Sequence, residues 1–201
     1  MTDPSSPTEN PSVNTLADPA RSPALEFHQA GIFYPYVGSF LVALASLPAI
    51  MDPNNPAKWA PGDRIELMGV QTPAREISPY EIHRQVIGKN LPHEYYCTNL
   101  CVMLTNTAYE AARDYNDRSP LFEFFRHLRN ARSHRNRFNF SVTEPARPAL
   151  WRTVTFDHMR KGEANPFYGQ PCFGHYFGFN DILELLWDVE QLILPRLPPT
   201  R

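Results

Sequence analysis

The chain has only three cysteines in 201 residues, too few for a disulfide framework, which favours a reducing compartment such as the cytoplasm. It also contains no P-loop, G-x-G-x-x-G, H-E-x-x-H or G-x-S-x-G motif and no internal repeat. Motifs therefore give no support to nucleotidyl transfer, dinucleotide binding, zinc proteolysis or serine hydrolysis. The first residues lack a basic region followed by an apolar core, so we expect no signal peptide.

Lysine is equally scarce, at three residues against sixteen arginines, while the formal net charge of the whole chain is −2. A hydrophobic content of 42% with 20% charged residues predicts one globular domain with a real core. Residues 1–23 are rich in Pro, Ser, Thr and Asn, and we expect them to form a disordered extension. The predicted organisation is this extension, a single helical domain over residues 24–194, and a tail over residues 195–201.

Positive charge is concentrated in one stretch, residues 121–140, with the sequence LFEFFRHLRNARSHRNRFNF. The spacing predicts a helix over residues 121–134, with Ser119 as its N-cap and Pro120 in its first turn. At about 100° per residue, one face of this helix is apolar and the opposite face is polar. The polar face carries Arg126, His127, Asn130, Ser133 and His134. A wet face of imidazole, amide and guanidinium groups is the reason to expect an active site here.

The pattern Arg129-Asn130-x-x-x-His134 within a helix resembles the Arg-x4–6-His motif of the HEPN superfamily. The longer phrase FFRHLRNARSH, after a helix that ends in AYEAARDYN, resembles the bacterial, plasmid- and mobile-element-associated branch of that superfamily. The resemblance extends over residues 24–194, and its specific part is residues 109–134. In that branch a glycine commonly follows the histidine, whereas Arg135 follows it here.

The resemblance implies a mainly α, HEPN-like helical bundle that acts as a homodimer and as a metal-independent endoribonuclease without a cofactor. It implies that His134 and Arg129 are catalytic. Asn130 lies one turn before His134, so it could orient the imidazole or the phosphate, or it could be a surface amide. The remaining basic residues of the stretch would contact RNA: Arg126, His127, Arg132, Arg135 and Arg137. Roles as a toxin or in phage defence, with an antitoxin or other partner protein, belong to the same expectation.

Helical geometry adds one argument about the dimer. Arg129 and His134 are five residues apart, which places them about 140° apart around an ideal helix. Two side chains so placed on a single helix would not bind the same phosphate. Two copies of the helix, facing each other across a dimer axis, would complete the site with residues from both subunits.

Other functions remain open from the residues alone. An Arg and a His at this spacing arise by chance in a chain with so many arginines, and a solvated basic helix end would give the same pattern. The main alternative is a non-catalytic helical module that binds RNA or an acidic partner protein through the basic helix. A third is a small membrane-associated protein, because residues 31–50 contain no charge and are long enough to span a bilayer. Pro35, Pro48 and the absence of a flanking basic cluster favour instead a buried first helix, which could also line a dimer interface.

The rest of the chain predicts smaller elements. We expect a short strand over residues 64–70, helices over 79–88 and 92–116, and a strand over 150–156 that pairs with 167–179 as a small β-hairpin. A final helix over 181–194 would be capped by Asn180 or Asp181, and its acids would face the basic helix or solvent. A zinc site could be imagined from His93, Cys97, Cys101, Cys172 and His175, but buried core thiols explain the cysteines more simply. We therefore expect no metal.

Overall fold

The computed structural model describes residues 27–52, 59–88, 92–141, 143–156 and 165–197. The expected extension, residues 1–23, and the end of the expected tail, residues 198–201, lie outside the described residues. The described chain is mainly α, with a small hairpin before the last helix, as the sequence predicts. Its helices are α1 (Tyr34–Met51), α2 (Pro79–Gly88), α3 (His93–Ala112), α4 (Pro120–Ser133) and α5 (Phe179–Ile193). Its strands are β1 (Ile65–Leu67), β2 (Arg75–Ile77), β3 (Ala149–Trp151) and β4 (Val154–Phe156), and 3-10 turns occupy Arg113–Tyr115 and Leu194–Arg196.

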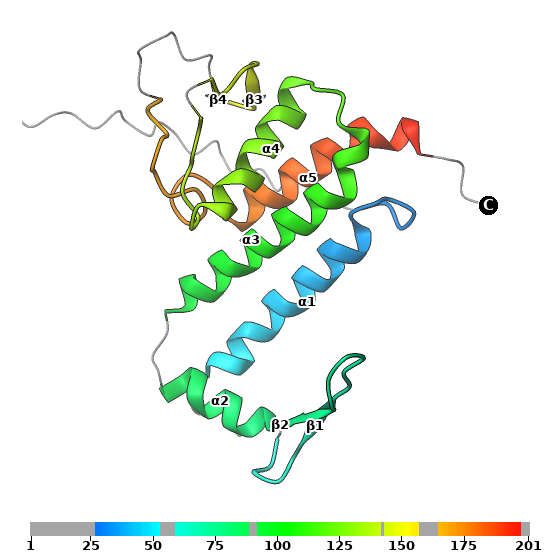
Figure 1. Ribbon diagram of the computed structural model, residues 1–201, viewed down its shortest axis with the longest axis vertical. Helices are drawn as coiled ribbons and strands as arrows, with labels where there is room; N and C mark the ends of the chain where they lie inside the picture. The colour runs from blue at the N-terminus through cyan, green and yellow to red at the C-terminus, as the bar shows by residue number, and fades with distance from the viewer. Residues whose placement is uncertain (1–26, 53–58, 89–91, 142, 157–164, 198–201) are drawn as a thin grey trace, which may run out of the picture.

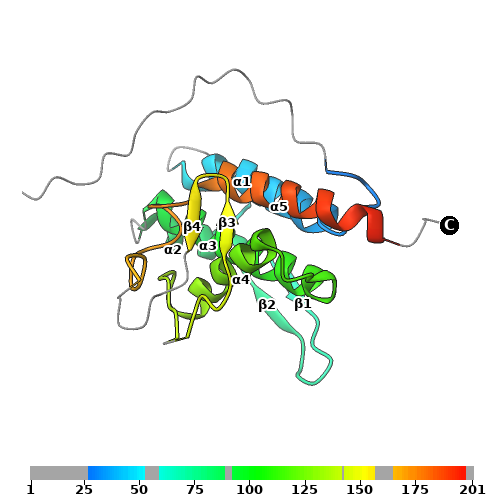
Figure 2. The ribbon, with the colours of Figure 1, turned by 90° about the horizontal axis from the view of Figure 1, so that it is seen from above.

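The long helix α3 lies at the centre of the bundle and packs against α1, α4 and α5 (Figure 1). Seen from above, α1 and α5 lie on one side of the molecule and α4 lies on the other (Figure 2). The antiparallel pair β1–β2 and helix α2 form a separate projection beside the C-terminal end of α1. The α4 helix is thus supported by the bundle, while its C-terminal end reaches the edge of the molecule.

The apolar stripe predicted for α4 is confirmed. Phe124, Phe125, Leu128 and Ala131 are fully buried, and Phe124 stacks on Phe156 with ring centroids 4.9 Å apart. The predicted cap is also present, since the backbone N–H of Phe122 donates to Oγ of Ser119 at 3.4 Å. Aromatic side chains of this size bury about 150–250 Å² each, so this stripe fixes α4 firmly in the core.

The uncharged segment near the N-terminus forms α1, a helix with a buried side and an exposed side. Val37, Phe40 and Leu47 are buried, whereas Leu41 and Val42 are exposed. Among the helices that the structure describes, none is long and apolar enough to cross a membrane.

Two sequence expectations about strands need correction. The stretch 150–156 is not one strand: it is a complete hairpin, in which β3 pairs with β4 around a tight turn at Arg152. Arg152 adopts φ +52°, a conformation that usually calls for glycine, so the turn carries no compositional signal. The expected partner, residues 167–179, instead forms only isolated bridges, one of them between Arg137 and Pro171.

The final helix also begins differently from the prediction. Gly178 is the N-cap, and Oδ2 of Asp181 accepts its N–H at 2.8 Å, so neither Asn180 nor Asp181 is the cap. The acids of α5 neither face α4 nor remain a free solvated surface. Glu184 pairs with Arg152 at 2.7 Å, Asp188 accepts Nε1–H of Trp151 at 2.8 Å, and Glu190 accepts the backbone N–H of Phe33 at 3.3 Å.

Candidate active site at the end of the basic helix

The α4 helix ends one residue earlier than predicted, so His134 lies in the turn that follows it. Arg135 and Asn136 both adopt left-handed conformations, with φ +58° and +60°. The backbone N–H of Arg137 then donates to the carbonyl of Ala131 at 3.2 Å, which closes the helix end. Glycine is the residue that such a position favours, and it commonly follows the histidine in the branch that the motif resembles. Arg135 therefore keeps the turn at a backbone cost of about 1–2 kcal/mol.

His134 is exposed, and its imidazole is held from one side. The amide nitrogen of Asn139 lies 2.8 Å from each of the two ring nitrogens. Asn139 comes from the segment after the turn, which runs back along α4. The imidazole is therefore presented to solvent by a folded turn and does not sit at a frayed helix end.

Arg129 points in another direction, towards α3. Its Nη2 donates to Oε1 of Glu110 at 2.7 Å, and its Cζ lies 5.6 Å from the ring centroid of Tyr109. The hydrogen bond from Arg129 lowers the pKa of the Glu110 carboxyl. Nη1 lies 3.5 Å from Oδ1 of Asn130, and the buried Nε has no hydrogen-bond partner among the described residues. The guanidinium is thus oriented by α3 while part of its donor capacity is unused.

Within the described part of the chain, no hydrogen bond or ion pair joins Arg129 and His134. Arg129 is engaged with α3, and His134 is engaged with the segment after α4. The ideal-helix angle between them no longer applies strictly, because His134 lies outside the helix. The structure shows instead that the two side chains contact different neighbours, Glu110 for Arg129 and Asn139 for His134.

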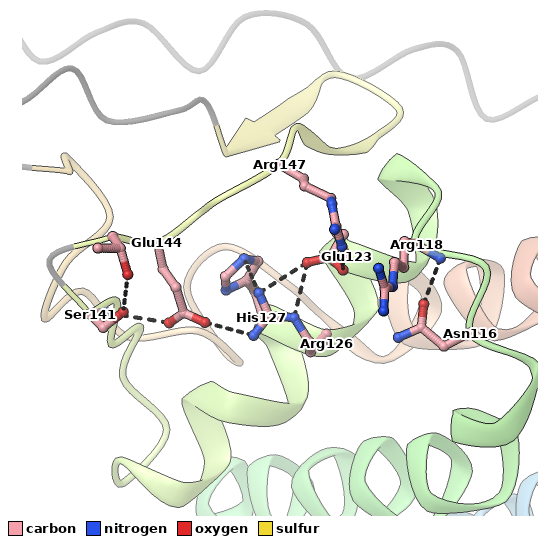
Figure 3. A network of polar contacts seen from close by, with 9 residues as sticks. Asn116, Arg118, Glu123, Arg126, His127, Ser141, Glu144 and Arg147 are labelled. Atoms are coloured by element: carbon pink, nitrogen blue, oxygen red, sulfur yellow. Dashed lines mark hydrogen bonds and ion pairs between the residues drawn. The ribbon is translucent and has the colours of Figure 1, made fainter.

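Arg126, expected to contact RNA, is instead the centre of a partly buried ion-pair network (Figure 3). Its Nε donates to Glu123 at 3.0 Å and its Nη1 donates to Glu144 at 2.8 Å, and its side chain is 23% exposed. Burial opposes the charged form of Arg126, but the two carboxylates outweigh burial and raise its pKa. Glu144 also accepts the backbone N–H of Ser141 at 3.3 Å. The network holds the segment after α4 against the helix.

The expectation that His127 lies on a wet face and contacts RNA is wrong. Its side chain is 1% exposed, and the rings of Phe140 and Phe156 lie 5.1 Å and 5.7 Å away. The helical wheel places His127 correctly on the side of α4 opposite the apolar stripe, but the segments after α4 fold back and cover that side of the helix. Burial, followed by the charge of Arg126, lowers the pKa of His127 to about 4, so the imidazole is neutral at neutral pH. Its Nε2 lies 3.2 Å from Nη2 of Arg126, while Nδ1 has no partner within the described part of the chain.

Two of the expected RNA-contacting arginines remain on the surface. Arg135 and Arg137 are exposed, and Nη1 of Arg137 donates to the carbonyl of Gly169 at 2.7 Å. The side chain of Arg132 lies outside the described residues. The accessible cations of the basic stretch are therefore gathered around His134, because acids from α3, α4 and the following segment neutralise Arg126 and Arg129.

No protein-family model, curated protein or solved structure matches this chain. The chemistry of the site must therefore be argued from its own residues. Sequence reasoning missed Glu110 and Asn139, which orient Arg129 and His134. Glu110 lies in another helix and Asn139 lies beyond the turn, so helical periodicity carries no signal for either contact.

In the part of the chain that the structure describes, no group of three or more His, Cys, Asp or Glu side chains is placed to bind a metal ion. All three cysteines are buried, and burial raises the pKa of Cys101 to about 12 and that of Cys172 well above its ordinary value. These thiols remain protonated at neutral pH, as expected for core residues. The side chain of His93 lies outside the described residues, and His175 is exposed.

Proposed function

We propose that this protein is a metal-independent endoribonuclease that acts as a homodimer, with His134 as general base and Arg129 as the phosphate ligand. The observation that carries the proposal is the exposed imidazole of His134, which is fixed by a folded turn and an amide contact from Asn139. An accessible imidazole is the side chain best suited to proton transfer near neutral pH. The toxin or phage-defence role, with an antitoxin partner, is what the HEPN resemblance adds to the proposal.

The proposed reaction uses the RNA itself as nucleophile. His134 removes the proton of a 2′-hydroxyl, whose oxygen attacks the adjacent phosphorus. A new bond forms between that oxygen and phosphorus, the bond from phosphorus to the 5′-oxygen breaks, and the leaving oxygen takes up a proton. Arg129 donates through Nη1, the nitrogen that is not paired with Glu110, to the non-bridging oxygens, where negative charge increases in the transition state. These steps need neither a redox partner nor an activated co-substrate.

The dimer is proposed because the two proposed catalytic side chains have different partners within one chain. Arg129 is held towards α3, while His134 contacts Asn139 in the segment after α4. A second copy related by a twofold axis would bring its His134 to this Arg129 and, by symmetry, form a second identical site. Asn130, one turn before His134, would then orient either the partner's imidazole or the phosphate.

Charge pairing argues against a purely electrostatic docking surface. Non-specific binding of nucleic acid depends on cations that can replace the counterions of phosphates. Arg126 and Arg129 already pair with carboxylates at 2.7–3.0 Å, so the stretch is less basic than its sequence indicates. A few accessible cations around one imidazole fit a localised site better than a broad binding face.

A non-catalytic protein-interaction module is the second candidate function, and the β1–β2 projection favours it. Met68 and Val70, in the loop between the two strands, are 78% and 97% exposed. Apolar side chains this exposed on a projecting hairpin are typical of an interaction surface. This candidate needs no imidazole, so it predicts that His134 can be replaced without functional loss.

Incubation of purified protein with RNA in the presence of EDTA tests the proposal. We expect cleavage in EDTA, and a loss of roughly 10²–10⁴-fold in rate for His134→Ala. The matched control is His83→Ala, which removes an imidazole from α2, away from α4. Cleavage that persists in His134→Ala would remove this residue as the base. If the wild-type protein cuts no RNA under these conditions, the endoribonuclease proposal is rejected and the interaction module remains as the candidate function.

A further inference from the structure

A loop distant in sequence is joined to the turn that carries His134. We call residues 165–178 the aromatic loop. The backbone N–H of Phe138 donates to the carbonyl of Gln170 at 3.0 Å, and that of Gly169 donates to Phe138 at 2.8 Å. The side chain of Asn136 adds two bonds to the backbone of Phe173, both at 2.9 Å. The loop and the end of α4 therefore form one unit (Figure 1).

The aromatic loop divides its rings between the core and the surface. Phe173 and Phe177 are buried, whereas Tyr168 is 59% exposed and Tyr176 is 40% exposed. His175 is exposed beside Tyr176, with ring centroids 4.6 Å apart. Three exposed aromatic side chains thus lie on a loop that is hydrogen-bonded to the proposed catalytic turn.

One cation is hydrogen-bonded to the backbone of this loop. Nη1 of Arg137 donates to the carbonyl of Gly169, directly after Tyr168, and the backbone N–H of Arg137 donates to the carbonyl of His134 at 3.2 Å. A short chain of hydrogen bonds thus leads from the proposed catalytic turn, through an exposed arginine, to the backbone beside the exposed Tyr168. Alternation of cation and aromatic ring matches a single strand of nucleic acid, in which every nucleotide offers one phosphate and one base face.

The two tyrosines are held by the backbone. The N–H of Tyr176 donates to the carbonyl of Cys172 at 3.0 Å, within a turn in which Gly174 adopts φ +82°. Its ring packs edge-on against Phe138 and Phe167, with centroids 6.1 Å and 5.3 Å away. The N–H of Tyr168 donates to the carbonyl of Asn165 at 3.0 Å. The ring of Tyr176 is held by these neighbours and the backbone of Tyr168 is held in a turn, so both positions lose little conformational entropy when a ligand binds.

We propose that Tyr168 and Tyr176 form a subsite that stacks the unpaired bases of single-stranded RNA, with Arg137 contacting the intervening phosphate. The inference rests on the proposed function for the identity of the polymer as RNA. Base faces are hidden in a duplex, so the subsite selects single strands, loops and bulges. It also orients the strand so that a flanking phosphodiester reaches His134.

Binding of a labelled, 2′-O-methylated oligouridine to the full-length protein, followed by fluorescence anisotropy, tests the subsite. Methylation removes the nucleophilic hydroxyl, so binding is measured without cleavage. Tyr168→Ala and Tyr176→Ala should each weaken binding roughly five- to hundredfold. Tyr34→Ala, a similarly exposed tyrosine at the start of α1, should leave it unchanged. An abasic oligonucleotide of the same length should bind all four proteins equally weakly.

Tyr176→Phe guards against misfolding, because it keeps the ring and should retain binding, and thermal unfolding by circular dichroism checks each variant. Equal binding by wild type and both alanine variants would overturn the proposal. The exposed tyrosines would then be assigned to contact with a protein partner. Tight binding of the abasic strand or of a duplex would also overturn it. Stacking without cleavage in the EDTA assay would reject the endoribonuclease alone, whereas cleavage without any tyrosine effect would reject the subsite alone.

Discussion

Replacement of the buried His127 by leucine should flatten the acid dependence of stability. The side chain is 1% exposed and its pKa is lowered from 6.5 to about 4, chiefly by burial. The unfolded chain therefore binds a proton as the pH falls below 6.5, whereas the folded protein resists it until about pH 4. The free energy of unfolding is then highest above pH 6.5 and decreases towards pH 4.

The size of this effect follows from the gap between the two pKa values. Each pKa unit corresponds to 1.36 kcal/mol, so His127 should account for roughly 3 kcal/mol of lost stability between pH 6.5 and pH 4. Glu144, whose pKa is lowered, also loses stability in acid, whereas Glu190, whose pKa is raised, acts in the opposite direction. The difference between wild type and His127→Leu cancels the contribution of Glu190 and most of that of Glu144, whose pKa depends chiefly on burial, Arg126 and the backbone of Ser141 and only last on His127.

Urea unfolding followed by tryptophan fluorescence, repeated between pH 7 and pH 4, measures this difference. At pH 7 the two proteins should differ by less than about 1.5 kcal/mol, because leucine has a similar volume and removes the unpartnered Nδ1. Towards pH 4 the variant should become the more stable of the two. Val189→Ala, a buried truncation on α5, should lower stability equally at every pH. Parallel pH profiles for wild type and His127→Leu would refute a neutral, buried His127.

Three further predictions concern the backbone and the ion-pair network. Gly31→Ala should destabilise the fold by roughly 1–3 kcal/mol in urea unfolding, because a Cβ there would overlap the buried carboxylate of Glu190 in α5. The control Gly38→Ala, which has open space around it, should be neutral or stabilising by up to about 1 kcal/mol. Arg135→Gly should raise stability by up to about 1 kcal/mol through relief of φ +58°, and Arg135→Ala should not; an equal effect of both would contradict the strain. Glu144→Gln should cost about 1–2 kcal/mol at pH 7 because it removes one of the two carboxylates paired with Arg126, and the cost should vanish as the pH falls through the lowered pKa of Glu144. A pH-independent cost would exclude the ion pair as its source.

Helical periodicity accounts for the parts of the fold that the sequence predicts well. The bounds of α2 agree with the prediction, and the apolar stripe of α4 is recognisable because its contacts repeat every three or four residues. The β3–β4 turn could not be predicted in the same way, because Arg152 occupies a position that usually contains glycine or asparagine. A left-handed arginine has no signature in a single sequence.

The candidate site was less accessible to sequence reasoning than the fold. A helical wheel correctly places His127 beside Asn130, but its exposure depends on Phe140 and Phe156, which only the tertiary fold brings over the helix. Pairing of Arg129 with Glu110 likewise joins two helices. The local excess of positive charge is therefore partly neutralised in the structure, where Arg126 and Arg129 pair with carboxylates while Arg135 and Arg137 stay exposed.

Mixing of two inactive variants tests the central claim, that Arg129 and His134 act together across a dimer. Arg129→Ala and His134→Ala proteins are each expected to be inactive, and a heterodimer would contain one doubly damaged site and one intact site. Under random subunit exchange half of the dimers are mixed, so about a quarter of the sites should regain RNA cleavage in EDTA. Proteins that demonstrably exchange subunits but recover no cleavage would contradict the composite site.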